Sequence, residues 1–141
     1  MDNKEFYTLK GYSLHEHEPI TTAMEDYLEM ICRISSTDGY VRVSKLSDKL
    51  NVRPSSVSKM VRQLADLNLV ECEKYGIIKP SKHGWEVGNY LLYRHDILNQ
   101  FFCIINKTEN ELEQTEKVEH FINRSTLINI SEFVQNYNKQ K

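Results

Sequence analysis

The sequence predicts a mainly α-helical protein, with an N-terminal winged helix-turn-helix and a small β-hairpin wing, followed by an all-helical C-terminal part. Two observations carry this prediction. Two short amphipathic helices meet at a turn over residues 41–67, and two short runs rich in β-forming residues follow them directly. The remaining segments show helical periodicity without an internal repeat.

Composition bounds the class of protein. The chain has 141 residues, 40% of them hydrophobic and 27% charged, which is typical of a folded globular domain. It has no long apolar run and no signal region, so we expect a cytoplasmic protein without a membrane partner. The net charge of −2 argues against a protein that coats nucleic acid indiscriminately, but it allows a local basic patch. The cysteines (Cys32, Cys72 and Cys103) form no C-x-x-C pair, so we expect reduced thiols and no thiolate zinc site.

The first helix follows an irregular N-terminal extension over residues 1–20. Within the extension, the stretch LHEHEP offers metal-ligand types, but an exposed lead-in is the simpler interpretation. Thr22 and Glu25 form a capping box, so a helix should begin near Ala23. The dipeptide Asp38-Gly39 should end it in a turn.

The helix-turn-helix follows. A short helix should bury Leu46 and Leu50, and Asn51 suits the left-handed conformation of a tight turn. Pro54 then suits the first turn of the second helix. Residues 69–72 and 77–79 read as two strands joined at Tyr75-Gly76, which makes the wing.

Three further helices are expected over residues 82–105, 111–123 and 126–137, the first capped by Ser81 and the last by Ser125. On the helical wheel of residues 111–123, Phe121 belongs to the predicted buried face. Glu119 lies on the opposite, polar face.

The helix beginning at Pro54 has one apolar face, formed by Val57, Met60, Val61 and Leu64. The opposite side carries hydroxyls followed by cations, and residues 55–64 contain no acid. This arrangement suits a helix that enters the major groove of double-stranded DNA, although a solvated face with two basic residues would look the same in isolation. The adjoining helix and wing favour DNA binding. The predicted contacts are Arg53, Pro54, Ser55, Ser56, Lys59, Arg62 and Lys74.

Metal-ligand residue types recur on three of the predicted helices. Asp26 and Glu29 share one helix, His95 lies in an apolar stripe of the second, and the stretch EKVEH on the third provides Glu116, Glu119 and His120. Each set alone has an ordinary explanation as surface charge or as a core histidine. If the three helices converge, the six residues provide only oxygen and imidazole ligands, which suit Mn²⁺ or Fe²⁺. Four carboxylates could bridge two such ions, and Fe²⁺, Co²⁺, Cd²⁺ or Zn²⁺ could substitute for Mn²⁺.

The chain resembles the diphtheria-toxin-repressor family, and within it the manganese transport regulators. The similar segments are TTAMEDYLEMI, RVSKLSDKLNVRPSSVSKMVRQL, EKYGIIKPSKHG, YRHDILNQF, EKVEH and SEFVQNY, and they span residues 21–137. The order of winged helix, YRH and E-x-x-E-H is far more specific than any one of these pieces.

The resemblance implies a winged-helix DNA-binding domain over residues 21–81 and a helical metal-binding and dimerisation domain over residues 82–141. It implies that all six residues above are ligands of a two-metal site and that the protein is a homodimer. The iron-sensing branch has methionine and cysteine at the positions of Asp26 and Glu116, so the oxygen ligands here favour Mn²⁺. Because the chain stops near Lys141, we expect no SH3-like third domain.

The resemblance thus implies a Mn²⁺-responsive repressor of manganese-uptake genes. Three alternatives remain open at this stage. They are an iron-responsive repressor of the same family, a metal-independent winged-helix regulator gated by a small organic ligand, and a di-metal enzyme. The enzyme fits least well, because di-iron enzymes pair two E-x-x-H helices that this chain lacks.

Overall fold

The computed structural model describes residues 20–141, so the N-terminal extension and its LHEHEP stretch lie, apart from Ile20, outside the described residues. The elements are α2 (Thr22–Asp38), β1 (Val41–Arg42), α3 (Val43–Leu50), α4 (Pro54–Asp66), β2 (Val70–Glu73), the 3₁₀ turn η1 (Lys74–Gly76), β3 (Ile77–Pro80), α5 (Lys82–Asn106), α6 (Leu112–Val118), the 3₁₀ turn η2 (Glu119–Phe121) and α7 (Arg124–Lys139). The predicted mainly α fold with a winged helix is confirmed. Between residues 20 and 141, none of the helices is both long and apolar enough to span a bilayer.

The winged helix forms as its turn residues dictate. Asn51 takes the left-handed conformation (φ 56°) between α3 and α4, and Pro54 is the first residue of α4. Strands β2 and β3 pair antiparallel, and the predicted turn at Tyr75 and Gly76 lies between them with positive φ at both residues. The prediction missed β1, a strand of two residues that pairs with β3 and gives the sheet order β1-β3-β2.

Two of the predicted helix caps are displaced along the chain. Helix α2 is capped by Thr21 rather than Thr22, and α7 is capped by Asn123 rather than Ser125. The cap of α5 by Ser81 is confirmed. In each case the capping side chain accepts a hydrogen bond from a backbone N–H of the first turn, which would otherwise lack a partner.

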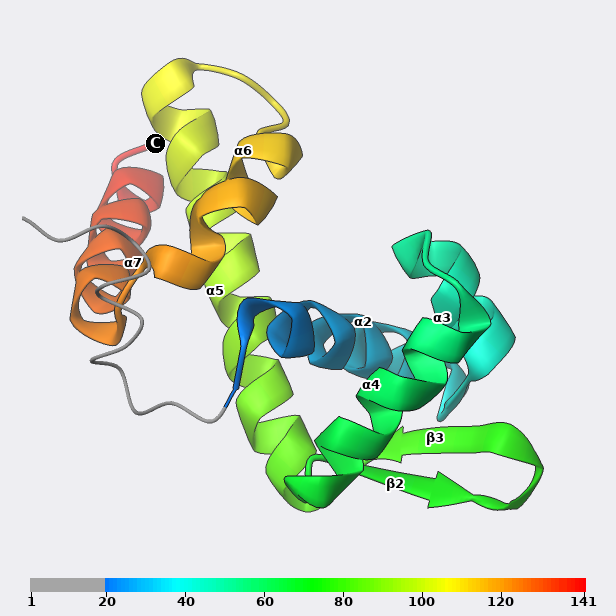
Figure 1. Ribbon diagram of the computed structural model, residues 1–141. Coiled ribbons are helices and arrows are strands. Elements are labelled where there is room, and N and C mark those ends of the chain that lie inside the picture. Colours follow the sequence, from blue (N-terminus) through cyan, green and yellow to red (C-terminus); the bar gives the residue numbers. More distant parts are fainter. Residues whose placement is uncertain (1–19) are drawn as a thin grey trace, which may run out of the picture.

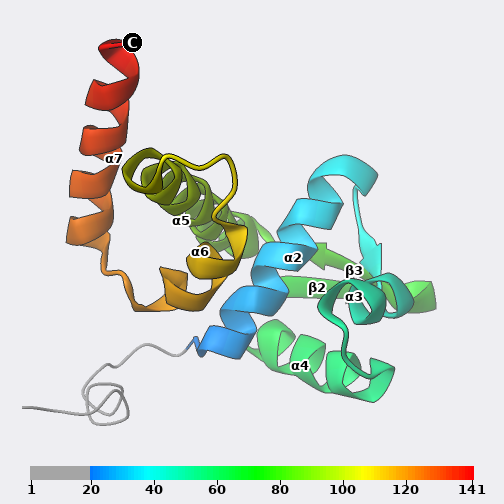
Figure 2. The same cartoon turned by 90° about the horizontal axis from the view of Figure 1, so that it is seen from above.

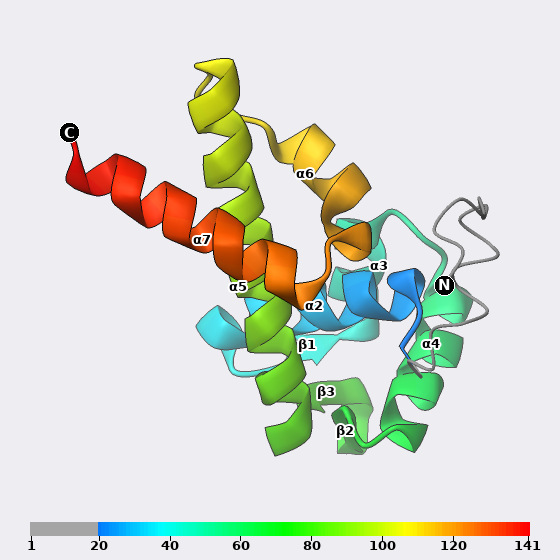
Figure 3. The same ribbon diagram turned by 90° about the vertical axis from the view of Figure 1, so that its left-hand side faces the viewer.

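Helix α5 contacts both the winged-helix part and the C-terminal helices. Figure 1 shows α2 and the winged helix around its first half, and α6 and α7 along its second half. Figure 2, seen from above, places α2 between α5 and α4, and Figure 3 shows α7 crossing α5. The main core joins α2, α3, α4, the sheet and the first half of α5, and it includes Leu28, Ile31, Leu46, Leu64 and Leu91. A smaller core joins α5 to α7 through Ile97, Leu98 and Leu127.

Helices α2 and α5 approach closely at Gly88. A Cβ atom at that position would lie 2.3 Å from Sγ of Cys32 and 3.2 Å from its Cβ, so only glycine fits without displacement. Both residues are buried, and Cys32 belongs to the main core and follows the candidate ligand Glu29 closely in α2. This close contact therefore sets the distance between the two helices that carry Asp26, Glu29 and His95.

Substitution Gly88→Ala should destabilise the protein by about 1–3 kcal/mol, because overpacking at Cys32 outweighs the better helix propensity of alanine. The double variant with Cys32→Ala should recover part of this loss, since the clashing sulfur is removed. Urea unfolding of both variants measures the effect, with Asn89→Ala on the exposed side of α5 as the control. Equal midpoints for wild type and Gly88→Ala would contradict the proposed constraint.

Candidate metal centre and DNA-binding surface

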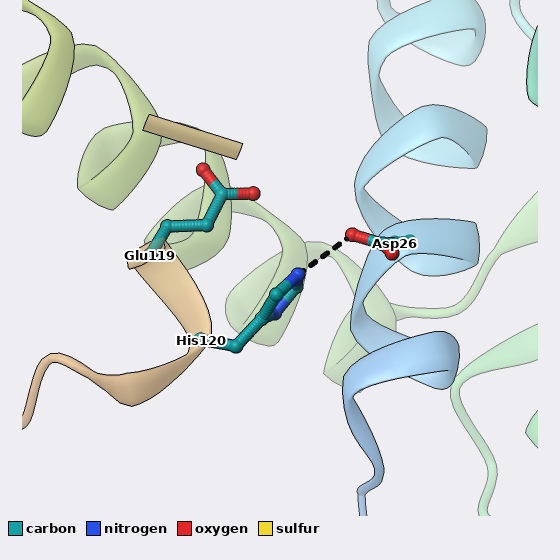
Figure 4. A group of neighbouring side chains, drawn as sticks. All are labelled: Asp26, Glu119 and His120. Atoms are coloured by element: carbon teal, nitrogen blue, oxygen red, sulfur yellow. Dashed lines mark ion pairs between the residues drawn. The ribbon is translucent and has the colours of Figure 1, made fainter. Parts of the chain in front are cut away.

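Five of the six predicted metal ligands converge. Asp26 and Glu29 come from α2, His95 comes from α5, and Glu119 and His120 come from η2. They form two groups, one of Asp26, Glu119 and His120 and the other of Glu29, His95 and Glu119, and in each group the ligand atoms lie within 4.8 Å of one another. Figure 4 shows Asp26 reaching from α2 toward the ring of His120, with Glu119 projecting from the same short segment as the histidine.

Glu119 belongs to both groups. It is 1% exposed, and its Oε2 lies 2.7 Å from Nδ1 of His95. At the other end of the cluster, the side chain of Asp26 is 54% exposed. The cluster is thus closed by Glu119 on the inside and open to solvent beside Asp26, an arrangement that gives a cation a route in.

The sixth predicted ligand, Glu116, lies outside both groups. It is exposed on α6 and lines a surface hollow with Glu111 and Glu113. The predicted faces of this segment were wrong: Glu119, placed on the polar face, is buried, and Phe121, placed on the buried face, is 59% exposed. The α-helix ends at Val118 and the tighter 3₁₀ turn changes the direction of the side chains that follow.

In the inner group, formed by Glu29, His95 and Glu119, burial and neighbouring charges shift the pKa values of two side chains. Burial and the nearby charge of Glu119 raise the pKa of Glu29 to about 7. The hydrogen bond to Glu119 raises the pKa of His95 above its usual value. Glu29 and His95 therefore retain protons that they would release in water, which is the condition of a site that gains by binding a cation.

The outer group, formed by Asp26, Glu119 and His120, has His120 at its centre. Its Nε2 lies 2.8 Å from Oδ1 of Asp26, and its Nδ1 lies 2.8 Å from Oε1 of Glu25. Hydrogen bonds to these two carboxylates raise the pKa of His120 to about 9. Burial acts to raise the pKa of Glu25, but the hydrogen bonds from His120 and Arg94 prevail and lower it.

Neither Glu25 nor Arg94 was among the predicted site residues. Glu25 was interpreted only as part of a helix cap, and Arg94 only as a letter of the YRH motif. A signal was present for Arg94, because Leu91 and Leu98 precede and follow it at helical spacing in the buried stripe of α5. The structure buries the arginine to 4% exposure. No comparable signal marks Glu25.

The donor set fits a hard or borderline divalent cation. All ligand atoms of the two groups are carboxylate oxygens or imidazole nitrogens, and Glu119 is placed to serve both groups. The nearest candidate thiol, Cys32, is buried, and burial raises its pKa to about 12, so it remains protonated. A protonated thiol is a poor metal ligand, and the set therefore contains no sulfur.

Helix α4 presents the predicted DNA-binding face to solvent. Val57, Val61 and Leu64 are buried and Met60 is partly buried, as the helical wheel predicted. All of the predicted DNA contacts are exposed: Arg53, Pro54, Ser55, Ser56, Lys59, Arg62 and Lys74.

The wing extends beside this helix (Figure 1). At its tip, Tyr75 is 85% exposed and has a positive φ of 66°. Nη1 of Arg42 donates a 2.9 Å hydrogen bond to the Tyr75 carbonyl, which ties the tip to β1. The tip of the wing is therefore held to the end of β1, next to the start of α3.

Comparison with known proteins agrees with this architecture. Residues 19–78 match the family model of the iron dependent repressor, N-terminal DNA binding domain. Over 121 residues the chain is 39% identical to the HTH-type transcriptional regulator MntR of Oceanobacillus iheyensis, an alignment that covers 84% of this chain and 81% of that protein.

Solved structures share the fold. The manganese regulator SloR matches with a TM-score of 0.70 and 24% identity over 79% of this chain, and IdeR of T. acidophilum matches with 0.67 and 22% over 77%. The chain spans about half the length of each, 53% and 52% respectively.

The winged helix and the matched domain define a DNA-binding transcriptional regulator. More closely, the chain belongs to the diphtheria-toxin-repressor family, in its MntR-like branch, and the resemblance found in the sequence is confirmed.

The charge of His120 should make the stability of the metal-free protein depend on pH. An unfolded histidine releases its proton near pH 6.5, whereas folded His120 retains it to about pH 9. Its contribution is fully present below about pH 6.5 and is lost as the pH rises through about 9. In chelator, we expect wild type to lose on the order of 1–3 kcal/mol more than His120→Gln across this window.

Thermal or urea unfolding at the two ends of the window measures this difference. The matched control is His83→Gln, because the side chain of His83 is 58% exposed on α5. The control should follow the wild-type curve. A His120→Gln curve parallel to wild type would show that the two carboxylates do not hold the imidazolium.

Proposed function

We propose that the protein is a Mn²⁺-dependent repressor that binds operator DNA and controls genes of manganese uptake. The observation that carries the proposal is the placement of Asp26 and Glu29, on a helix of the winged-helix part, against His95, Glu119 and His120 of the C-terminal helices. A cation held there would join the DNA-binding part to the rest of the chain. The identity to MntR supports manganese as the signal.

The charges of the site explain how occupancy would change the protein. Asp26, Glu29 and Glu119 bring three carboxylates together from α2 and η2, and like charges at this distance oppose the approach of the two elements. A bound divalent ion supplies the positive charge that offsets this repulsion. Asp26 and Glu29 then stay against η2, and the arrangement of α2 that suits DNA binding becomes the favoured one.

The ligand types favour Mn²⁺ over Fe²⁺. The resemblance places methionine and cysteine of the iron branch where this chain has Asp26 and Glu116, and oxygen ligands suit the harder ion. Two groups that share Glu119 support two ions per chain. The same donors accept Fe²⁺, Co²⁺, Cd²⁺ or Zn²⁺, so an iron-responsive repressor is the nearest alternative.

A homodimer would complete the DNA-binding unit. Helix α7 and the end of α5 leave large apolar side chains exposed: Ile105, Ile128, Phe133 and Tyr137. A second copy of the chain covering this surface would bury them. The two α4 helices of such a dimer would read half-sites separated by about 34–36 Å, one turn of DNA.

The exposed face of α4 favours a DNA-binding regulator over the di-metal enzyme. Family membership favours a metal-dependent regulator over one that is gated by an organic ligand. The organic-ligand alternative predicts equal affinity for DNA with and without metal. The dependence of DNA affinity on Mn²⁺ therefore separates this alternative from the proposal.

The first test is a titration of the chelator-stripped protein with Mn²⁺. Calorimetry measures the binding of the ion, and a DNA-binding assay measures the affinity for the DNA upstream of a manganese-uptake gene of the same organism. We expect about two ions per chain and a rise in DNA affinity of about tenfold or more, within the usual range of allosteric coupling. Equal DNA affinity in chelator and in Mn²⁺ would overturn the proposal.

Substitution Arg62→Ala separates the two activities in the same assay. We expect weaker DNA binding, by about 1–3 kcal/mol, because a groove or phosphate contact of α4 is lost. Mn²⁺ binding should be unchanged, since Arg62 lies on α4 and the ligands do not. Lys139→Ala, at the exposed end of α7, is the matched control for removing one positive charge.

Glu116 provides a separate test of the ligand set. If its side chain joins the cluster on metal binding, Glu116→Gln should weaken Mn²⁺ binding about tenfold or more, a loss typical of a perturbed metal site. Glu113→Gln, on the same helix and paired with Lys117, should bind like wild type. Equal calorimetric isotherms for the two variants would remove Glu116 from the site and leave five ligands.

A further inference from the structure

We infer that Glu25 and Arg94 are positioning residues that orient His120 so that its Nε2 faces the ligand group. The inference rests on the proposed metal function and extends it to two residues outside the predicted ligand set. Both lie next to a ligand in the chain, Glu25 before Asp26 and Arg94 before His95.

Two consecutive carboxylates occupy opposite sides of one imidazole. Oε1 of Glu25 lies 2.8 Å from Nδ1 of His120, and Oδ1 of Asp26 lies 2.8 Å from Nε2. When Nδ1–H donates to Glu25, the neutral ring has its lone pair on Nε2, the atom that faces Asp26. A second carboxylate that fixes the tautomer and the ring orientation is the usual partner of a metal-binding histidine.

Glu25 is held in this role by Arg94. The guanidinium nitrogens lie 3.3 and 3.5 Å from the two carboxylate oxygens of Glu25, and the side chain of Arg94 is 5% exposed. A carboxylate paired in this way is occupied, and Glu25 belongs to neither group of converging ligand atoms. The pair therefore separates the roles of two adjacent acids, with Asp26 open to a cation and Glu25 committed to His120.

The energetics of a buried arginine point in the same direction. In the described part of the chain, Nε of Arg94 is buried without a hydrogen-bond partner. A buried ion pair of this kind is often no more stabilising than an apolar side chain of similar size. Stability alone therefore gives little reason for arginine at this position, whereas the orientation of His120 gives a specific one.

The test compares Glu25→Ala and Glu25→Gln with wild type in full-length protein. Calorimetry gives the affinity for Mn²⁺, and ¹⁵N NMR of the histidine rings in Cd²⁺-loaded protein reports which nitrogen of His120 carries the proton. We expect Glu25→Ala to weaken Mn²⁺ binding by about 10- to 100-fold, the usual effect of removing an outer partner, with loss of the single Nδ1–H form. Glu25→Gln retains an acceptor oxygen and should recover most of both properties.

The control is Glu86→Ala, because that side chain is 65% exposed near the start of α5 and belongs to neither ligand group. If Glu25→Ala does not fold, Arg94→Leu decides the question. It removes the clamp on Glu25, and we expect weaker Mn²⁺ binding with a mixed population of His120 tautomers.

Wild-type affinity together with an unchanged His120 spectrum in the folded Glu25→Ala or Arg94→Leu variant would overturn the inference and leave the proposed function intact. Failure of the wild-type chain to bind either Mn²⁺ or Cd²⁺ would instead overturn the proposed function, and the inference with it.

Discussion

The contact between Gly88 and Cys32 sets how closely α2 approaches α5. Helix α2 belongs to the main core through Leu28 and Ile31, and it meets α5 where the absence of a side chain at Gly88 allows a close approach. That approach brings the carboxylate of Glu29 within reach of His95. The hydrophobic packing of the DNA-binding part and the geometry of the metal centre therefore depend on the same interhelical distance.

The metal centre is an electrostatic compromise in the absence of a cation. Protons on His95 and His120, together with the fixed charge of Arg94, balance the acids that α2 and η2 bring together. The raised pKa values of both histidines mean that metal must displace protons in order to bind. Metal binding at this site is therefore coupled to proton release.

Sequence periodicity predicted those parts of the fold in which one regular element buries one face. Helix α4 is the clearest case, because Val57, Val61 and Leu64 repeat at helical spacing and no competing pattern interrupts them. The same reasoning failed at residues 119–121, since a helical wheel assumes a continuous α-helix and the chain changes there to a 3₁₀ turn. Strand β1 escaped prediction because its two residues pair only through a partner far along the chain.

Five of the six predicted ligands converge in the structure, and they were predicted because their residue types are those that metals bind and the resemblance gave their order. The supporting pair, Glu25 and Arg94, could not be found in the same way. Their roles arise from the meeting of α2, α5 and η2, which no local pattern encodes. Glu116 has the right residue type and spacing, yet the structure places it on the surface, so type and spacing do not determine position.

In both α2 and α5 a positioning residue directly precedes a candidate metal ligand, and this adjacency has an evolutionary consequence. In α2 the dipeptide is Glu25-Asp26, and in α5 it is Arg94-His95. Each residue of an α-helix is rotated by about 100° from the one before it. A single-residue insertion or deletion between such a dipeptide and the core residues that fix its helix, for example between Asp26 and Leu28, would therefore turn the ligand out of the cluster. Point substitution can adjust the preference for one ion over another at this site, whereas a change in helix length would abolish the site in one step.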